Sequence, residues 1–69
     1  MTKEQFVHHR RPNAVLRGGP LAGGRIRVEQ IAPYVDLVEA QRVYYRPIAE
    51  IDDEYPNLVV YAYDHSESA

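Results

Sequence analysis

The glycine-rich stretch RGGPLAGGR, at residues 17–25, constrains the fold more than any other part of the sequence. Glycine adopts positive φ angles without steric cost and proline fixes one torsion, so such a stretch is typical of a turn. Residues 14–17 and the alternating RIRVE at 25–29 both favour strands. We therefore predict a β-hairpin whose four loop glycines supply positive φ and whose leucine plugs the turn from below. The structural turn comprises Gly18, Gly19, Pro20, Leu21, Gly23 and Gly24.

A phosphate-binding loop is the alternative interpretation of this stretch. Such a loop needs backbone N–H groups that converge on the anion at the amino end of a helix. Here Gly23 and Gly24 precede a strand pattern, and Arg25–Ile26 occupies the place of the required lysine and hydroxyl residue. The sequence thus favours a structural turn, and we expect no cofactor and no small-molecule substrate.

A second hairpin is predicted in the C-terminal half of the chain. Two β-rich runs, at residues 42–51 and 58–65, are separated by the polar loop DDEYPN. Because Pro47 has no N–H to donate to a ladder, its strand should be an edge or carry a bulge at that point.

The segment between the two hairpins, residues 30–41, is ambiguous. A short helix after Pro33 and an extended crossing both remain open, and we favour the extended path, which would bury Val35 and Leu37. The expected fold is all-β: a small antiparallel sheet or partly open barrel of about four strands, with an extended N-terminal arm. The expected organisation is an arm at 1–13, a β domain at 14–65 and a polar tail at 66–69.

Antiparallel counting outward from the 52–57 loop gives the second hairpin two different faces. This register sets Arg46 opposite Tyr63 and Ile48 opposite Tyr61. The expected core face holds Val43, Tyr45, Pro47, Ala49, Ile51, Leu58, Val60 and Ala62. The expected mixed face holds Arg42, Tyr44, Arg46, Ile48, Glu50, Val59, Tyr61, Tyr63 and His65.

The mixed face is rich in tyrosine and arginine, two residue types that are enriched at protein interfaces. The alternative is that its tyrosines line the second side of a small barrel with their hydroxyls at the rim. We favour a protein interface. Its predicted residues are Tyr44, Arg46, Ile48, Tyr61 and Tyr63, together with Arg10 and Arg11 of the arm.

Size and charge suggest that the chain depends on other molecules. A domain of 69 residues without cysteine has a small core and no disulfides, which leaves oligomerisation or a partner as its supplement. Residues 1–34 carry a net charge of +4 and residues 35–69 a net charge of −6. These halves either favour contact with neighbouring copies or with a charged partner surface, or they neutralise each other within one fold. No apolar run is long enough for a membrane span, so we expect no membrane partner.

The sequence offers no convincing catalytic or metal-binding set. His8 and His9 would point apart on an extended arm, and Ser66 and Ser68 are expected in a polar tail with nothing to activate them. The acidic run at 52–54 lacks the spaced oxygen ligands of a calcium loop. The short basic cluster HHRR supports at most a backbone contact to nucleic acid in a chain that is acidic as a whole. We expect no enzyme activity, no metal and no nucleic-acid partner.

The segments LRGGPLAGGRIRV and RVYYRP…LVVYAYD resemble short uncharacterised proteins of actinobacteria and their bacteriophages. The resemblance covers about residues 14–64, although Ala22 stands where an acidic residue is common and the basic arm is longer. The resemblance itself names no activity. The function that we favour is a virion protein assembled in the host cytoplasm: a minor capsid or decoration component that binds a major capsid protein or copies of itself. The alternative is a cytoplasmic protein-binding module with a regulatory role.

Overall fold

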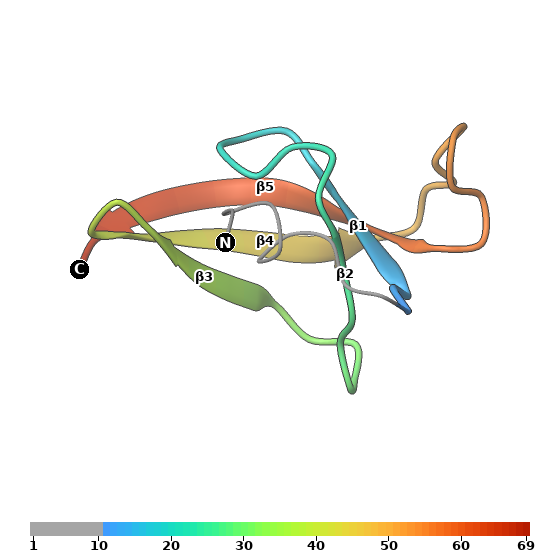
Figure 1. Ribbon diagram of the computed structural model, residues 1–69, viewed down its shortest axis with the longest axis horizontal. Coiled ribbons are helices and arrows are strands. Elements are labelled where there is room, and N and C mark those ends of the chain that lie inside the picture. The colour runs from blue at the N-terminus through green and yellow to red at the C-terminus, as the bar shows by residue number, and fades with distance from the viewer. Residues whose placement is uncertain (1–10) are drawn as a thin grey trace.

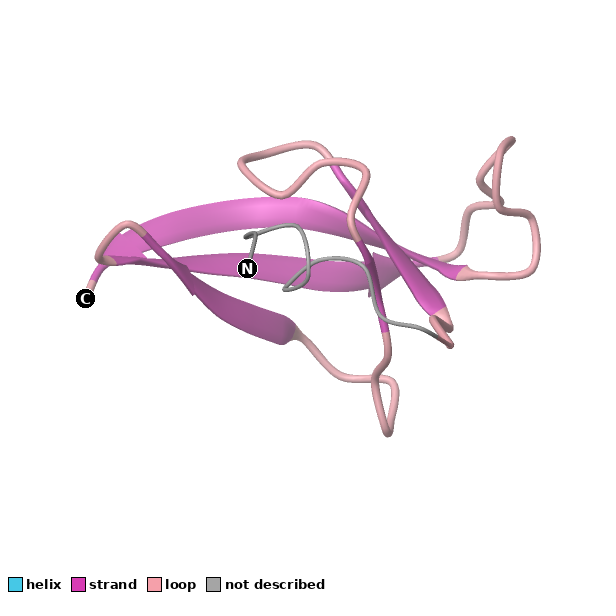
Figure 2. Ribbon diagram, viewed as in Figure 1, coloured by secondary structure: helices cyan, strands magenta, loops and turns pink. Residues whose placement is uncertain are grey.

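The computed structural model describes residues 11–69, which consist of strands and loops without a helix (Figure 2). The expectation of an all-β fold is confirmed. The strands are β1 Ala14–Arg17, β2 Arg25–Ile26, β3 Tyr34–Val38, β4 Gln41–Ile48 and β5 Val59–Ser68.

All five strands belong to one sheet, in the order β2-β1-β5-β4-β3, which curls into half of a barrel (Figure 1). Both predicted hairpins form, as the antiparallel pairs β1–β2 and β4–β5. The sheet differs from the expected one in two ways: it has five strands, and β1 runs parallel to β5. That pair joins the two ends of the described chain, and no local pattern in the sequence encodes it.

The core lies on the concave face of the sheet, which we call the inner face. Its buried residues are Ala14, Leu16, Ile26, Val43, Tyr45 and Tyr61, and partly buried side chains of Leu21, Val28, Tyr34, Val38 and Val59 pack against them. Tyr34, Tyr45 and Tyr63 occupy aligned positions on β3, β4 and β5, so tyrosines cross this face in a row. The inner face therefore combines tyrosine rings with aliphatic side chains.

The opposite, outer face also buries apolar side chains near its centre. Val15 and Val60 are neighbours in the β1–β5 register and are 3% and 0% exposed. Arg25, which pairs with Val15 in the β1–β2 register, places its guanidinium carbon 5.0 Å from the centre of the Tyr55 ring, within the range of a cation–π contact. This contact ties β2 to the loop between β4 and β5.

The predicted register of the β4–β5 hairpin is wrong by one residue next to its loop. Ile48 pairs with Val60 and Arg46 with Ala62. A β-bulge, which places one extra residue in β5 between Tyr44 and Tyr45 of β4, restores the predicted pairing of Tyr44 with His65. Counting without a bulge could not find this register.

The bulge explains which predicted faces are wrong. The faces of β4 are as predicted, whereas those of β5 are exchanged before the bulge. Tyr61 and Tyr63 therefore lie on the inner face, and Val60 and Ala62 on the outer face. The predicted aliphatic core face and tyrosine-rich outer face are corrected accordingly.

Pro47 pairs with Tyr61 of β5 at a point that β3 does not reach, because β3 ends its pairing at Tyr45. β4 is therefore an edge strand at Pro47, as predicted. The bulge lies in β5, opposite the step between Tyr44 and Tyr45 of β4.

Residues 30–41 were expected to be extended, and β3 has that conformation, but its faces are opposite to the prediction. Val35 and Leu37 are 45% and 63% exposed on the outer face, while Tyr34 and Val38 pack against the core. The two-residue turn after β3 has positive φ at Glu39 (50°) and at the next residue (67°). Because β3 is the last strand of the sheet, the side chains of Val35 and Leu37 lie at its margin.

The predicted domain boundaries also change. β5 continues to Ser68, so the expected polar tail at 66–69 is mostly strand. Asn13, expected in the arm, is bound to the sheet: its side chain accepts from the Val28 amide at 2.9 Å and donates to the Val28 carbonyl at 2.8 Å. Its carbonyl accepts from the Val59 amide at 3.0 Å. Residues 1–10 of the predicted arm lie outside the described residues.

Candidate protein-interaction surface

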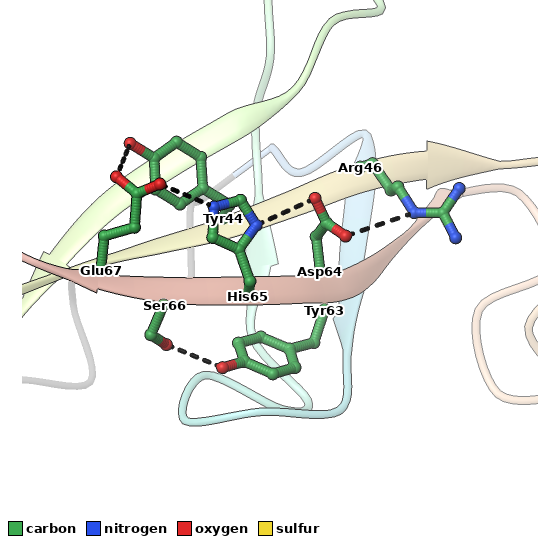
Figure 3. A network of polar contacts seen from close by, with 7 residues as sticks. All are labelled: Tyr44, Arg46, Tyr63, Asp64, His65, Ser66 and Glu67. Carbon is green, nitrogen blue, oxygen red and sulfur yellow. Dashed lines mark hydrogen bonds and ion pairs between the residues drawn. The ribbon is translucent and has the colours of Figure 1, made fainter.

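The outer face of β4 and β5 carries basic, acidic and aromatic side chains close together. Strand alternation brings the β4 residues to this face, and the bulge turns two consecutive β5 residues toward it (Figure 3). We call this surface the outer patch. Its members are Arg42, Tyr44, Arg46, Asp64, His65 and Glu67.

A stacked pair of rings forms the centre of the outer patch. Tyr44 and His65 are directly opposite in the register, and their rings lie 4.4 Å apart at an interplanar angle of 7°. The His65 nitrogens lie 3.1 Å from an Asp64 oxygen and 3.2 Å from a Glu67 oxygen. The Tyr44 hydroxyl donates to Glu67 at 3.2 Å. Both rings are thus held in fixed positions at the surface (Figure 3).

Two arginines flank the rings. Arg46 Nε lies 3.9 Å from Asp64, and Arg42 lies 4.0 Å from Glu67. Half or more of each arginine side chain is exposed, and exposed ion pairs of this kind stabilise a fold by at most about 1 kcal/mol. Because these contacts are weak, the guanidinium groups can exchange them for contacts with another molecule.

The neighbouring carboxylates change the acid–base behaviour of His65. The hydrogen bond to Asp64 is the largest influence, and with Glu67 it raises the pKa of His65 above 6.5, although partial burial opposes the shift. The imidazole therefore keeps its proton to a higher pH than a free histidine. When it is protonated, its single positive charge attracts the two carboxylates beside it.

The outer patch includes some of the predicted interface residues and excludes others. Tyr44 and Arg46 belong to it, and Ile48 is half-buried on the same face. Tyr61 is 0% exposed on the inner face, so its predicted place on an exposed interface is wrong. Tyr63 is 37% exposed on the inner face, where its hydroxyl lies 2.8 Å from Ser66 Oγ.

The arm arginines and the acidic members of the patch complete the comparison. Arg11 is exposed, and its carbonyl accepts a bond of 3.2 Å from Arg27; Arg10 lies outside the described residues. Sequence reasoning missed Asp64 and Glu67 as members of the patch. Alternation in YDHSES could have indicated Glu67, but only the bulge brings Asp64 beside His65.

The glycine-rich stretch forms the loop between β1 and β2. Gly18, Gly19 and Gly23 have positive φ, whereas Gly24 does not, so the prediction of positive φ at all four glycines is wrong at that position. Leu21 packs against the core, and its amide donates to the Tyr45 hydroxyl at 2.9 Å.

The backbone amides of the glycine-rich loop donate hydrogen bonds to carbonyls of the loop and of β1. The amides of Ala22, Gly23 and Gly24 donate to carbonyls of Gly19, Leu16 and Leu21 respectively. Since the Leu21 amide is also engaged, four consecutive N–H groups have hydrogen-bond partners within the protein. They do not converge on a common anion, so the loop acts as a structural cover for the core.

The loop between β4 and β5 encloses a shallow hollow of about 590 Å³ beside Arg17. Arg17 binds Glu50 and Asp52, which neutralises part of the opposite charge of the two halves within one fold. Asp52 accepts the amides of Tyr55 and Glu54 at 3.0 and 3.1 Å, and these bonds lower the pKa of Asp52. The polar groups named here stabilise the loop through contacts with one another. None of them is directed at a ligand.

Known sites and known proteins give no further assignment. No three acidic or histidine residues within 11–69 are grouped closely enough to hold a metal ion. In the same part of the chain, no helix has the length and apolar character that crossing a membrane requires. No family model, curated protein or solved structure matches this chain.

Proposed function

We propose that this protein is a small structural component of a multi-subunit assembly, a minor capsid or decoration protein of a phage particle, and that the outer patch binds neighbouring protein subunits. The observation that carries the proposal is the stack of half-buried Tyr44 on exposed His65 at the surface, held by carboxylates and flanked by arginines.

The geometry of the outer patch suits protein binding. A ring that is already held in place loses little conformational freedom on binding, and tyrosine and arginine are the side chains that most often dominate interface energies. The two arginines balance Asp64 and Glu67, so the patch without a charged histidine is neutral overall. Recognition would then depend on matched hydrogen bonds and ring contacts rather than on net charge.

The setting comes from the resemblance of the glycine-rich turn and of the final strand to actinobacterial and phage proteins. A shell offers many identical sites at fixed spacing, and contacts that bridge adjacent subunits bind far more tightly together than each does alone. A patch on one strand pair is enough for such a role, because each copy needs only a modest affinity.

Mass spectrometry of purified particles tests the setting. We expect this chain in particles from cells that express it, at a fixed ratio to the major shell protein. Recovery only in the soluble fraction, bound to another protein, would contradict the virion role and would favour the cytoplasmic regulatory module instead.

Variants of the outer patch test the binding surface. Tyr44→Ala and Arg46→Glu should each lower incorporation into particles at least about tenfold, the change typical of a residue that dominates an interface. Arg27→Glu is the matched control, because it makes the same charge change at an exposed site outside the patch. Equal loss in all three variants would show that the patch is not the binding surface.

A further inference from the structure

The strand β3 forms one margin of the sheet. It is the last strand in the sheet order and pairs only with β4 among the described residues (Figure 1). Its sequence, YVDLV, contains a single charged residue, and Val35 and Leu37 expose their side chains on the outer face. An apolar margin with unpaired backbone groups is a template for another strand.

Asp36 lies at the centre of this strand and is held in a defined position. The Tyr34 hydroxyl donates to one of its oxygens at 3.0 Å, and the Leu37 amide donates to the other at 2.8 Å. The carboxylate is thus fixed on the inner face at the margin of the sheet. It also accepts the hydrogen bond of a backbone amide of β3, the strand to which it belongs.

The sequence of β3 is self-complementary when two copies run antiparallel about this central residue. In that register Val35 of one copy lies opposite Leu37 of the other, and Tyr34 lies opposite Val38. Both kinds of pair are apolar, and such cross-strand pairs stabilise a ladder. The only unfavourable pair is the central one, where Asp36 meets its own copy.

We propose that the open margin of β3 is a self-association surface at which two copies of this chain pair antiparallel, and that Asp36 keeps this association weak by placing two carboxylates opposite each other. The pairing joins two five-stranded sheets into one continuous sheet. Five residues per copy is far fewer than the roughly 20–30 of a standard interface, so the wild-type dimer forms only at high concentration. This surface is separate from the outer patch on β4 and β5.

Substitution of the central residue tests the proposal in the full chain. Asp36→Asn keeps an acceptor for the Leu37 amide and removes the charge, so the dimer dissociation constant should fall at least about tenfold in sedimentation equilibrium. Asp53→Asn removes an exposed loop carboxylate and should leave the constant unchanged. An Asp36→Asn protein that associates no better than wild type overturns the proposal.

Two further variants identify the surface. Adding Val35→Lys to Asp36→Asn should return the protein to the wild-type constant, because it puts a charge opposite Leu37 of the second copy. A dimer that survives this second change uses another surface and contradicts the proposal. Circular dichroism on every variant confirms that the sheet is intact.

A disulfide provides a direct readout, because the chain contains no cysteine. Opposite residues of antiparallel strands lie about 4.5–5.5 Å apart between Cα atoms, which is within the range of a disulfide. Asp36→Cys should therefore form a covalent dimer on mild oxidation at least about tenfold faster than Asp53→Cys at the same concentration. Equal rates for the two cysteines would show that the β3 margins do not meet.

Discussion

The two hairpin turns at the ends of β1 and β3 reverse the chain in different ways. In the β1–β2 loop every residue with positive φ is a glycine. In the two-residue turn between β3 and β4 the positive φ angles belong to Glu39 and Ala40, at 50° and 67°. Each such angle costs a residue with a Cβ roughly 1–2 kcal/mol. The first turn is therefore relaxed, and the second is strained.

The surroundings of the two turns explain the difference. The glycine loop folds back onto Tyr63 and Tyr45, where a side chain would collide, so only glycine fits at Gly19. The Glu39–Ala40 turn is exposed and needs no close approach, and the pairing of β3 with β4 maintains it. Contact with the core thus requires glycine in the first turn. In the second turn, the pairing of β3 with β4 holds residues that do not favour positive φ.

The largest effect is expected at the glycine loop. A Cβ at Gly19 would lie 2.5 Å from Tyr63 Cδ1 and 2.9 Å from the Tyr45 hydroxyl, at a φ of +68°. Gly19→Ala should lower the free energy of unfolding by about 2–4 kcal/mol, measured by chemical denaturation. At Gly23, with φ +85°, a Cβ meets nothing within 4 Å, so Gly23→Ala should cost only about 1–2 kcal/mol. Equal losses would show that the approach to the tyrosines is unimportant.

The second effect concerns the hydroxyl that holds the glycine loop. Tyr45 is fully buried, donates to the Gly18 carbonyl at 2.7 Å and accepts from the Leu21 amide at 2.9 Å. Tyr45→Phe leaves both backbone groups without their partner and should lower the free energy of unfolding by about 1–3 kcal/mol in the same assay.

Tyr61→Phe is the matched control for this loss. Tyr61 is equally buried, but its hydroxyl has no hydrogen-bond partner among residues 11–69. Its removal should leave stability unchanged or raise it by up to about 1 kcal/mol. A loss as large as that of Tyr45→Phe would mean that the hydrogen-bond partners of the two tyrosine hydroxyls are wrongly assigned.

A smaller change of opposite sign is expected at the strained turn. Ala40→Gly relieves the positive φ at that residue and should raise the thermal midpoint, with a gain in the free energy of unfolding of about 0.5–1 kcal/mol after the entropy of glycine in the unfolded chain is included. Ala49→Gly, at an exposed residue without positive φ, should instead lower the midpoint. A loss at both positions would show that the turn is not strained.

The smallest effect is the pH dependence of the outer patch, on β5 and on β4, the strand that follows the strained turn. Asp64 and Glu67 raise the pKa of His65 above 6.5 in the folded chain, so protonation favours the folded state. The resulting stabilisation is complete below the unfolded pKa and disappears as pH rises through the higher folded pKa. Thermal melts across this range should show the loss in wild type and not in His65→Gln, and an NMR titration of the ring should give a midpoint above 6.5. A midpoint at or below that value contradicts the assigned contacts.

Local signals in the sequence were reliable where one turn or one strand decided the structure. The glycine stretch marked the first hairpin, and Pro47 marked the place where β4 loses its neighbour β3. The candidate surface was predicted only in part: Tyr44 and Arg46 as interface residues, and Arg42 and His65 as members of the same face. The Glu39–Ala40 turn carries no turn-forming residue, so nothing in the sequence indicated it.

The β-bulge was decisive for the remainder. Strand alternation has a period of two, so one extra residue in β5 reverses the faces of all residues before it. Tyr61, which was predicted on the surface, therefore lies in the core. Asp64 lies on the outer face together with His65.

The sequence by itself determined the class of fold, the positions of the two hairpins and the need for glycine in the first loop, because backbone torsions and side-chain alternation act over a few residues. Only the tertiary structure decided that β1 pairs in parallel with β5, which tyrosines are buried and which residues gather on the outer patch. These features depend on contacts between strands that are distant in the chain, and their free energy arises only when the whole sheet has assembled.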